Sequence, residues 1–205
     1  MNPKRTLAIG VTGGIGSGKS EVCAIFKSLG GIIYSSDAIA KEVMNTDPRL
    51  KKRITTLCGS SIYRQDGALD KKAMAKLIFT DDLLKVKINA IVHPVVIKYL
   101  DDVIQSAKIS PKISLMFIES ALIYDAGIQD LFDYIILVLS SEETSVNRVL
   151  KRDGISKSEV QARRSAQAPP EQHREKADFT IDNTGDLQSL KNNCEFLYSI
   201  LTKLN

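Results

Sequence analysis

The chain of 205 residues has few cysteines, little excess charge of either sign and no long apolar run. Its three cysteines, Cys23, Cys58 and Cys194, lie far apart and form no Cys-x-x-Cys pair, which excludes a disulfide framework and a zinc cluster. No segment approaches the ~20 apolar residues of a membrane helix. Lys and Arg number 28 against 24 acidic residues, an excess too small to indicate nucleic-acid binding. We therefore expect a cytoplasmic protein that binds neither membrane nor nucleic acid.

What the sequence does contain is an alternation of short apolar runs with helix-favouring stretches. Because the apolar runs are mostly continuous rather than alternating, they are typical of strands covered on both faces by helices. This predicts an α/β fold with a mostly parallel five-stranded sheet. The five expected strands are Leu7 to Thr12, Ile32 to Tyr34, Ile113 to Ile118, Tyr134 to Leu139 and Phe179 to Ile181.

Two helical stretches are expected as insertions in a single domain that spans residues 1–205. The first covers about residues 37–112, and the second, with five arginines, covers about residues 141–176. The remaining core is expected at about 1–36, 113–140 and 177–205.

Capping residues mark several helix starts in these stretches. Asp70 precedes a helical pattern over 71–79, and the spacings of Ser140 with Glu143 and of Ser156 with Glu159 are those of capping boxes. Pro94 is expected to interrupt the helical pattern over 81–107. From Leu187 onward, leucines at helical spacing predict a closing helix.

The segment Gly13 to Ser20 reads Gly-Gly-Ile-Gly-Ser-Gly-Lys-Ser and satisfies the phosphate-loop pattern G-x-x-x-x-G-K-[ST]. Glycines let backbone N–H groups converge on phosphate oxygens, and the following helix points its positive end at the same place. Lys19 would reach the β- and γ-phosphates, and the Ser20 hydroxyl would bind Mg²⁺. A simple glycine-rich turn is the alternative. A GTPase switch is disfavoured because the chain has no Asn-Lys-x-Asp motif.

Several further blocks of sequence accompany this loop in a fixed order. They are Asp37-Ala38-Ile39-Ala40-Lys41, His93-Pro94, Glu119 to Asp125, Lys151-Arg152-Asp153, Arg163 to Gln167 and Asp182-Asn183-Thr184-Gly185. Together with the loop they resemble the dephospho-coenzyme A kinase family. The resemblance implies a three-layer P-loop kinase fold, with an acceptor-binding insertion at 37–112 and a lid at 141–176. It also implies transfer of a phosphoryl group from ATP, with Mg²⁺, to the ribose 3′-hydroxyl of dephospho-coenzyme A, the last step of coenzyme A synthesis.

The resemblance also implies roles for individual residues, each with a plainer alternative. Asp37 matches the general base, although an acid there could simply complement the helix dipole. Glu119 would bind the substrate and hold Mg²⁺, or be only a strand-end acid. His93 would contact the substrate, or have a structural role beside Pro94. Arg148 and Arg152 lie four residues apart on one helix face and would stabilise the transferred phosphoryl group, or form a solvated basic face.

The nucleotide site is expected to consist of the phosphate loop and two further residues. Asn183 would lie beside the adenine, unless it belongs to an ordinary turn. The complete expected set is Gly13, Gly14, Ile15, Gly16, Ser17, Gly18, Lys19, Ser20, Glu21 and Asn183.

The chain also departs from the usual family pattern at three positions. Glu21 replaces a common Thr, Ala121 a common Pro, and Ser35 a frequent Asp. Two rival functions remain: a nucleoside or nucleotide kinase, and a P-loop nucleotide switch without a small-molecule acceptor. The protein is expected to be a monomer or a weak homo-oligomer.

Overall fold

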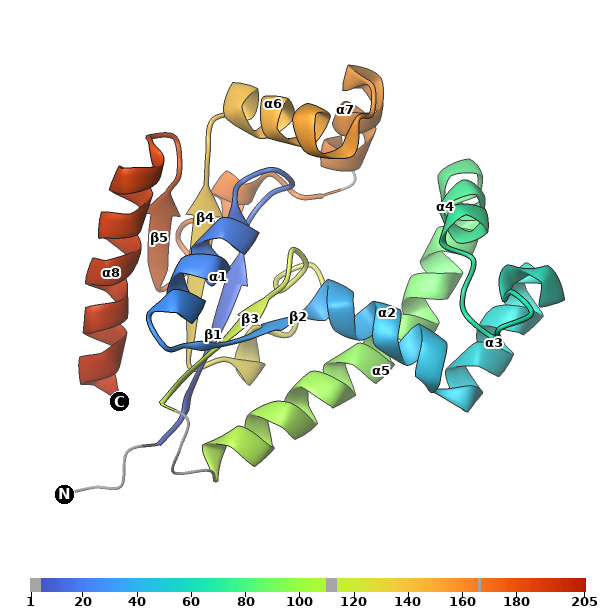
Figure 1. Ribbon diagram of the computed structural model, residues 1–205, viewed down its shortest axis with the longest axis horizontal. Coiled ribbons are helices and arrows are strands. Elements are labelled where there is room, and N and C mark those ends of the chain that lie inside the picture. Colours follow the sequence, from blue (N-terminus) through green and yellow to red (C-terminus); the bar gives the residue numbers. More distant parts are fainter. Residues whose placement is uncertain (1–4, 110–113, 166) are drawn as a thin grey trace. The chain divides into compact units, whose positions relative to one another are not determined.

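A computed structural model describes residues 5–109, 114–165 and 167–205, except for the side chain of Phe79. Its centre is a five-stranded sheet with the strand order β2-β3-β1-β4-β5, in which every pairing is parallel (Figure 1). The strands are β1 (Leu7–Thr12), β2 (Ile32–Ser35), β3 (Leu115–Glu119), β4 (Tyr134–Leu139) and β5 (Phe179–Asp182). All five expected strands are therefore confirmed, although Ile113, the expected first residue of the third, lies outside the described residues.

Eight α-helices and three short 3-10 helices accompany the sheet in the described residues. The α-helices are α1 (Lys19–Ser28), α2 (Ser36–Thr46), α3 (Pro48–Cys58), α4 (Lys71–Thr80), α5 (Asp82–Lys108), α6 (Glu142–Asp153), α7 (Lys157–Ser165) and α8 (Leu187–Leu204). The 3-10 helices are η1 (Ser60–Ile62), η2 (Gln129–Leu131) and η3 (Pro170–His173). Of the described helices, none combines the length and apolarity needed to cross a bilayer.

The chain divides into two compact units. The first, Met1–Ser35 with Val103–Asn205, contains the sheet, α1, α6, α7, α8 and the last residues of α5. The second, Ser36–Asp102, contains α2, α3, α4 and most of α5.

The main core of the first unit lies between the sheet and the helices α1 and α8 (Figure 1). Alternate residues of β1, such as Leu7, Ile9 and Val11, face this layer, as the two-residue period of a strand requires. Phe26 of α1 stacks on Phe117 of β3 with ring centroids 4.3 Å apart, and both side chains are fully buried. On the opposite face, Ile123 and Phe132 lie so close to Gly10 that a Cβ there would meet both side chains.

The second unit is held together by capped helices around a smaller core. Asp47 and Asp70 each accept two backbone N–H groups and so begin α3 and α4. Leu50, Ile54 and Ile62 are fully buried in this unit. The expected start at Asp70 is confirmed.

Two local expectations are wrong, and each error has a physical cause. The helix after β4 is capped by Ser141 rather than Ser140, because the Ser141 hydroxyl accepts the Thr144 N–H at 3.1 Å while the Ser140 hydroxyl bonds that of Ser145. The expected interruption at Pro94 is absent, because α5 continues through it. A proline inside a helix removes one backbone hydrogen bond, which packing of residues such as Leu100 can offset.

The Phe26–Phe117 stack gives a direct test of the core. Phe117→Ala removes a fully buried ring and should lower the free energy of unfolding by about 3–5 kcal/mol, as measured by urea denaturation. Phe196→Ala is the matched control, because that ring on α8 is 68 % exposed and its loss should cost no more than about 0.5 kcal/mol. Equal losses for the two variants would contradict the described core.

Candidate active site

The phosphate loop joins the end of β1, the central strand, to the start of α1. Its shape depends on glycine, because Gly16 and Gly18 have left-handed backbones with φ of +76° and +95°. A Cβ on Gly16 would clash with the Ser145 carbonyl, and one on Gly18 with the Asn183 amide. The loop therefore lies directly against α6 and the residue after β5, and a side chain at either glycine would disturb both contacts.

Lys19 is folded back over this loop. Its ammonium donates hydrogen bonds to the carbonyl oxygens of Gly13 at 2.8 Å and Gly14 at 2.9 Å. The lysine that the motif assigns to phosphate therefore lies over the mouth of the loop, within reach of any anion bound there.

Ser20 and Glu119, the two expected metal ligands, meet in the structure. The Ser20 hydroxyl donates to the Glu119 carboxylate at 2.6 Å across 99 residues of sequence. Glu119 ends β3, where its Cα pairs with Val11 of β1 and with Ser35 of β2. A hydroxyl and a carboxylate are the hard oxygen donors that Mg²⁺ prefers, and Mg²⁺ commonly takes only one or two carboxylates beside phosphates and water. The residues present therefore fit that ion.

Asn183 and Arg148 both reach the backbone of the phosphate loop. Asn183 is 3 % exposed, and its amide donates to the Ser17 carbonyl at 2.9 Å. The Arg148 guanidinium donates to the same carbonyl at 3.4 Å and to the Asn183 side-chain oxygen at 3.3 Å. These residues border a cavity of about 270 Å³ with Gly18, Glu21 and Leu187. Three of the expected site residues, Glu21, Arg148 and Asn183, are thus brought together beside the loop.

Gln167, which follows α7, also contacts the phosphate loop. The Ile15 N–H donates to the Gln167 side-chain oxygen at 3.1 Å, and Pro170 lies against Gly14. Gln167 borders a cavity of about 510 Å³ together with Ile15 and Arg164. Gln167 ends the block Arg163 to Gln167, which resembles the family pattern, and the backbone contact gives it a definite partner.

Arg152 lies one turn after Arg148 on α6 but has different contacts. Its guanidinium forms an ion pair with Asp153 at 2.7 Å, and its side chain is 62 % exposed. The hydrogen bond that Arg152 donates to Asp153 and the charges of Asp153 and Glu119 all raise the pKa of Arg152. The two arginines that were expected to act together therefore have different contacts: Arg148 binds the phosphate loop, whereas Arg152 is exposed to solvent beside Asp153.

Asp37 and His93 belong to the second compact unit. Asp37 is exposed in the first turn of α2, two residues after the end of β2. His93 is half-buried on α5, directly before Pro94. Their expected roles rest on chain position and on the family pattern.

Tyr124 and His173 form a contact that could not be predicted from the sequence. Their rings stack with centroids 4.5 Å apart, which joins the turn after β3 to η3. Burial and the charge of Asp178 raise the pKa of Tyr124. His173 belongs to no sequence pattern, and the two residues come from the turn after β3 and from the segment between α7 and β5.

Three features occur together: a phosphate loop after the central strand of a parallel sheet, an acid that ends the neighbouring strand, and a helical segment with arginines after β4. This combination defines the class of P-loop kinases. A solved structure, TT1252 from Thermus thermophilus, superposes with a TM-score of 0.78 at 33 % identity and covers 98 % of this chain and all of its own.

The family follows from comparison of sequences. A family model described as dephospho-CoA kinase matches residues 7–189. Curated dephospho-CoA kinases from Geobacter sulfurreducens and Chlorobaculum tepidum are each 34 % identical to this chain; the alignments cover 93 % and 98 % of this chain and 96 % and 99 % of theirs. The chain belongs to the dephospho-CoA kinase family. It is therefore a phosphotransferase of coenzyme A biosynthesis with ATP as a substrate.

Proposed function

We propose that this protein moves the γ-phosphoryl group of ATP to the ribose 3′-hydroxyl of dephospho-coenzyme A, producing coenzyme A and ADP. The observation that carries the proposal is the family match over residues 7–189. In this proposal one kinase domain contains two functional insertions. Residues of about 37–112 bind the acceptor, and those of about 141–176 form the lid over the phosphates.

The ATP phosphates bind the loop from Gly13 to Ser20. Lys19 exchanges the Gly13 and Gly14 carbonyls for the β- and γ-phosphate oxygens, since an ammonium prefers the more negative partner. Arg148 and Asn183 keep the Ser17 carbonyl turned away from the nucleotide, which leaves the N–H groups of the loop for phosphate. The cavity beside Gly18, Glu21 and Asn183 is the proposed place of the adenosine.

The Ser20 hydroxyl and the Glu119 carboxylate would hold Mg²⁺, which would supply positive charge beside the phosphates. Their 2.6 Å contact supports this assignment, because both oxygens already converge on one point. When bound, the ion neutralises charge on the β- and γ-phosphates.

Asp37 is the proposed general base. Ser35 pairs with Glu119 on the neighbouring strand, at the edge of the sheet where the proposed metal site lies. Asp37 follows Ser35 by two residues. Two peptide units span less than about 8 Å. The proton of the 3′-hydroxyl passes to the Asp37 carboxylate as the oxygen bonds phosphorus, ADP leaves, and the carboxylate then releases the proton to water. His93 is the proposed contact for the acceptor in the same unit.

Arg152 stabilises the charge that spreads over the transferred phosphoryl oxygens, and Arg148 supports the same step from the loop. The exposure of Arg152 beside the α6–α7 turn supports this role. We place the protein in the cytoplasm as a monomer or weak homo-oligomer, in agreement with three free thiols, all in described residues.

The reaction is tested with a panel of acceptors in an assay of ADP release. Dephospho-coenzyme A should stimulate ADP release strongly, while nucleosides and nucleoside monophosphates should not. Equal turnover with every acceptor, or with none, would exclude the proposed acceptor and favour a broad nucleotide kinase or a nucleotide switch.

Asp37→Asn tests the general base. The amide keeps the shape of the side chain but cannot take the proton, so kcat should fall by at least about 10²-fold while the KM for ATP stays near its original value. Asp130→Asn, which removes an exposed acid from η2, is the control and should leave kcat unchanged. Near-normal turnover of Asp37→Asn would remove Asp37 from the mechanism.

Glu119→Gln tests the metal site. Loss of the carboxylate charge should raise the Mg²⁺ concentration for half-maximal activity by about tenfold or more, measured by Mg²⁺ titration at fixed ATP. Glu195→Gln removes an exposed acid from α8 and should not change the titration. An unaltered Mg²⁺ dependence in Glu119→Gln would mean that Glu119 only holds Ser20.

A further inference from the structure

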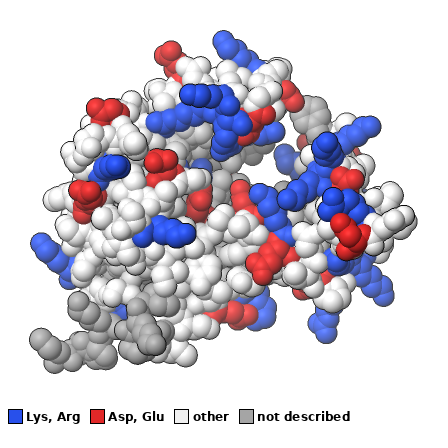
Figure 2. Space-filling view, in the orientation of Figure 1, with Lys and Arg blue, Asp and Glu red and all other residues white. Residues whose placement is uncertain are grey.

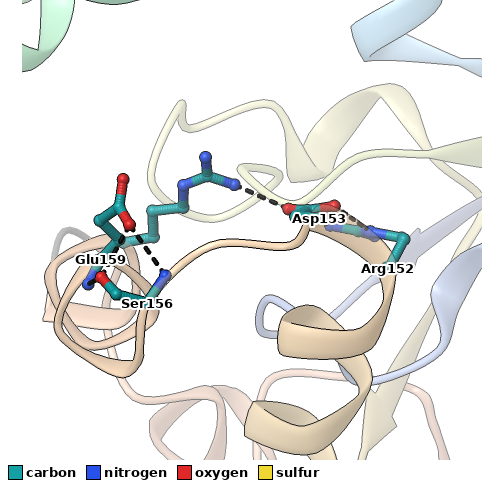
Figure 3. A network of polar contacts seen from close by, with 5 residues as sticks. Arg152, Asp153, Ser156 and Glu159 are labelled. Carbon is teal, nitrogen blue, oxygen red and sulfur yellow. Dashed lines mark hydrogen bonds and ion pairs between the residues drawn. The ribbon is translucent and has the colours of Figure 1, made fainter.

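Asp153, the last residue of α6, binds two arginines at once (Figure 3). One carboxylate oxygen accepts from Arg152 Nε at 2.7 Å. The other accepts from Arg152 Nη2 at 3.2 Å and from Arg163 Nη1 at 2.8 Å. A single carboxylate thus joins an arginine of α6 to an arginine of α7.

Asp153 is less exposed to solvent than the two arginines that it binds. The Asp153 side chain is 21 % exposed, whereas those of Arg152 and Arg163 are 62 % and 49 % exposed. Each guanidinium has five N–H donors in a fixed plane, and Asp153 uses two from Arg152 and one from Arg163. The remaining donors suffice for a second anion, and phosphate oxygens match this planar geometry well.

The local backbone supports the arrangement. Gly154 ends α6 with a left-handed turn at φ +64°, so the chain reverses toward α7. Ser156 and Glu159 form a complete capping box, in which the Ser156 N–H donates to the Glu159 carboxylate at 2.8 Å and the Glu159 N–H donates to the Ser156 hydroxyl. The expected capping box is thus confirmed. Arg163 lies one turn after Glu159 on α7 and donates to Asp153, which is ten residues earlier in the sequence.

The geometry of the donors, rather than a large net charge, favours an anion at this place. The hydrogen bond from Arg152 lowers the pKa of Asp153, which therefore stays ionised near neutrality. Arg152 and Arg163 exceed Asp153 by one positive charge, but the charge of Glu159 also acts on Arg163 and offsets that excess. Over α6 and α7, at the top of Figure 2, basic side chains lie beside acidic ones. The Glu119 charge also acts on Arg152, which connects this cluster electrostatically with the proposed Mg²⁺ site.

We propose that Asp153 is a positioning residue that holds Arg152 and Arg163 as a paired binding site for the phosphate oxygens of the two substrates. This inference rests on the proposed function, which assigns Arg152 to the transferred phosphoryl group. It adds Arg163 as a second phosphate-binding arginine and gives Asp153 the task of setting the distance and the planes of both guanidinium groups before substrate arrives.

Kinetics of Asp153→Asn test the proposal. The amide keeps one acceptor oxygen but loses the charge, so it cannot hold both arginines. We expect kcat/KM for ATP to fall by about tenfold, as expected for loss of one charge-assisted hydrogen bond from the transition state. Asp153→Glu restores the carboxylate and should recover part of the loss. Asp130→Asn again serves as the control for loss of one exposed acid.

A background without the two arginines separates positioning from a structural role. In Arg152→Ala/Arg163→Ala, adding Asp153→Asn should reduce kcat/KM less than twofold further, because no partners remain to be positioned. A full tenfold effect in that background would mean that Asp153 acts on the fold, and the inference would be wrong. A gain in ATP affinity in Asp153→Asn alone would also overturn it, because Asp153 would then compete with phosphate.

The two proposals can fail separately. If Arg152→Ala lowers turnover and Asp153→Asn does not, the inference fails and the assignment of Arg152 stands. If Arg152→Ala/Arg163→Ala turns over as fast as the unaltered protein, the assignment of Arg152 fails and the inference fails with it. Melting temperatures of all variants, measured by circular dichroism, verify that they are folded.

Discussion

The site depends on one backbone carbonyl, that of Ser17 in the phosphate loop. Asn183, from the end of β5, and Arg148, from α6, both donate to it. A loop whose N–H groups must face an anion has to direct its carbonyls elsewhere, and each buried carbonyl needs a donor. Because the donors come from two elements far along the chain, the loop, the last strand and the lid segment form one constrained assembly.

The sheet explains why distant residues could be assigned to one site from sequence. Ser20 and Glu119 are 99 residues apart, yet Glu119 ends β3 and Ser20 lies at the start of α1, which the phosphate loop joins to the end of β1; parallel strands bring their carboxyl ends to one edge. Strand identity was predictable because short, β-rich apolar runs alternate with longer helix-favouring stretches. The glycines of the loop were equally predictable, since their motif states a backbone requirement.

The remaining contacts could not be predicted, because they depend on side-chain partners that no periodicity encodes. Ser140 and Ser141 are equally good caps in sequence, and the contact with Ser145 decides between them. A proline ends most helices, but α5 continues through Pro94 because the packing of α5 offsets the missing N–H donor. The bond from the Asn183 amide to the loop backbone was likewise absent from the sequence prediction, which named Asn183 only as a neighbour of the adenine. Asp153 belongs to the block Lys151-Arg152-Asp153, but its contact with Arg163 could not be predicted because Arg163 lies ten residues away.

The segment of residues 141–176 shows why net charge says little about function. Its arginines are not a uniform basic surface, because Asp153 lies between two of them and Glu142 lies 3.7 Å from Arg164. Free arginines would repel one another and lose side-chain entropy on meeting a phosphate. An acid between them relieves the repulsion in advance and leaves a small positive charge with fixed geometry. A kinase that must enclose two polyphosphate substrates and then release both products benefits from such moderate, oriented charge more than from a larger unoriented one.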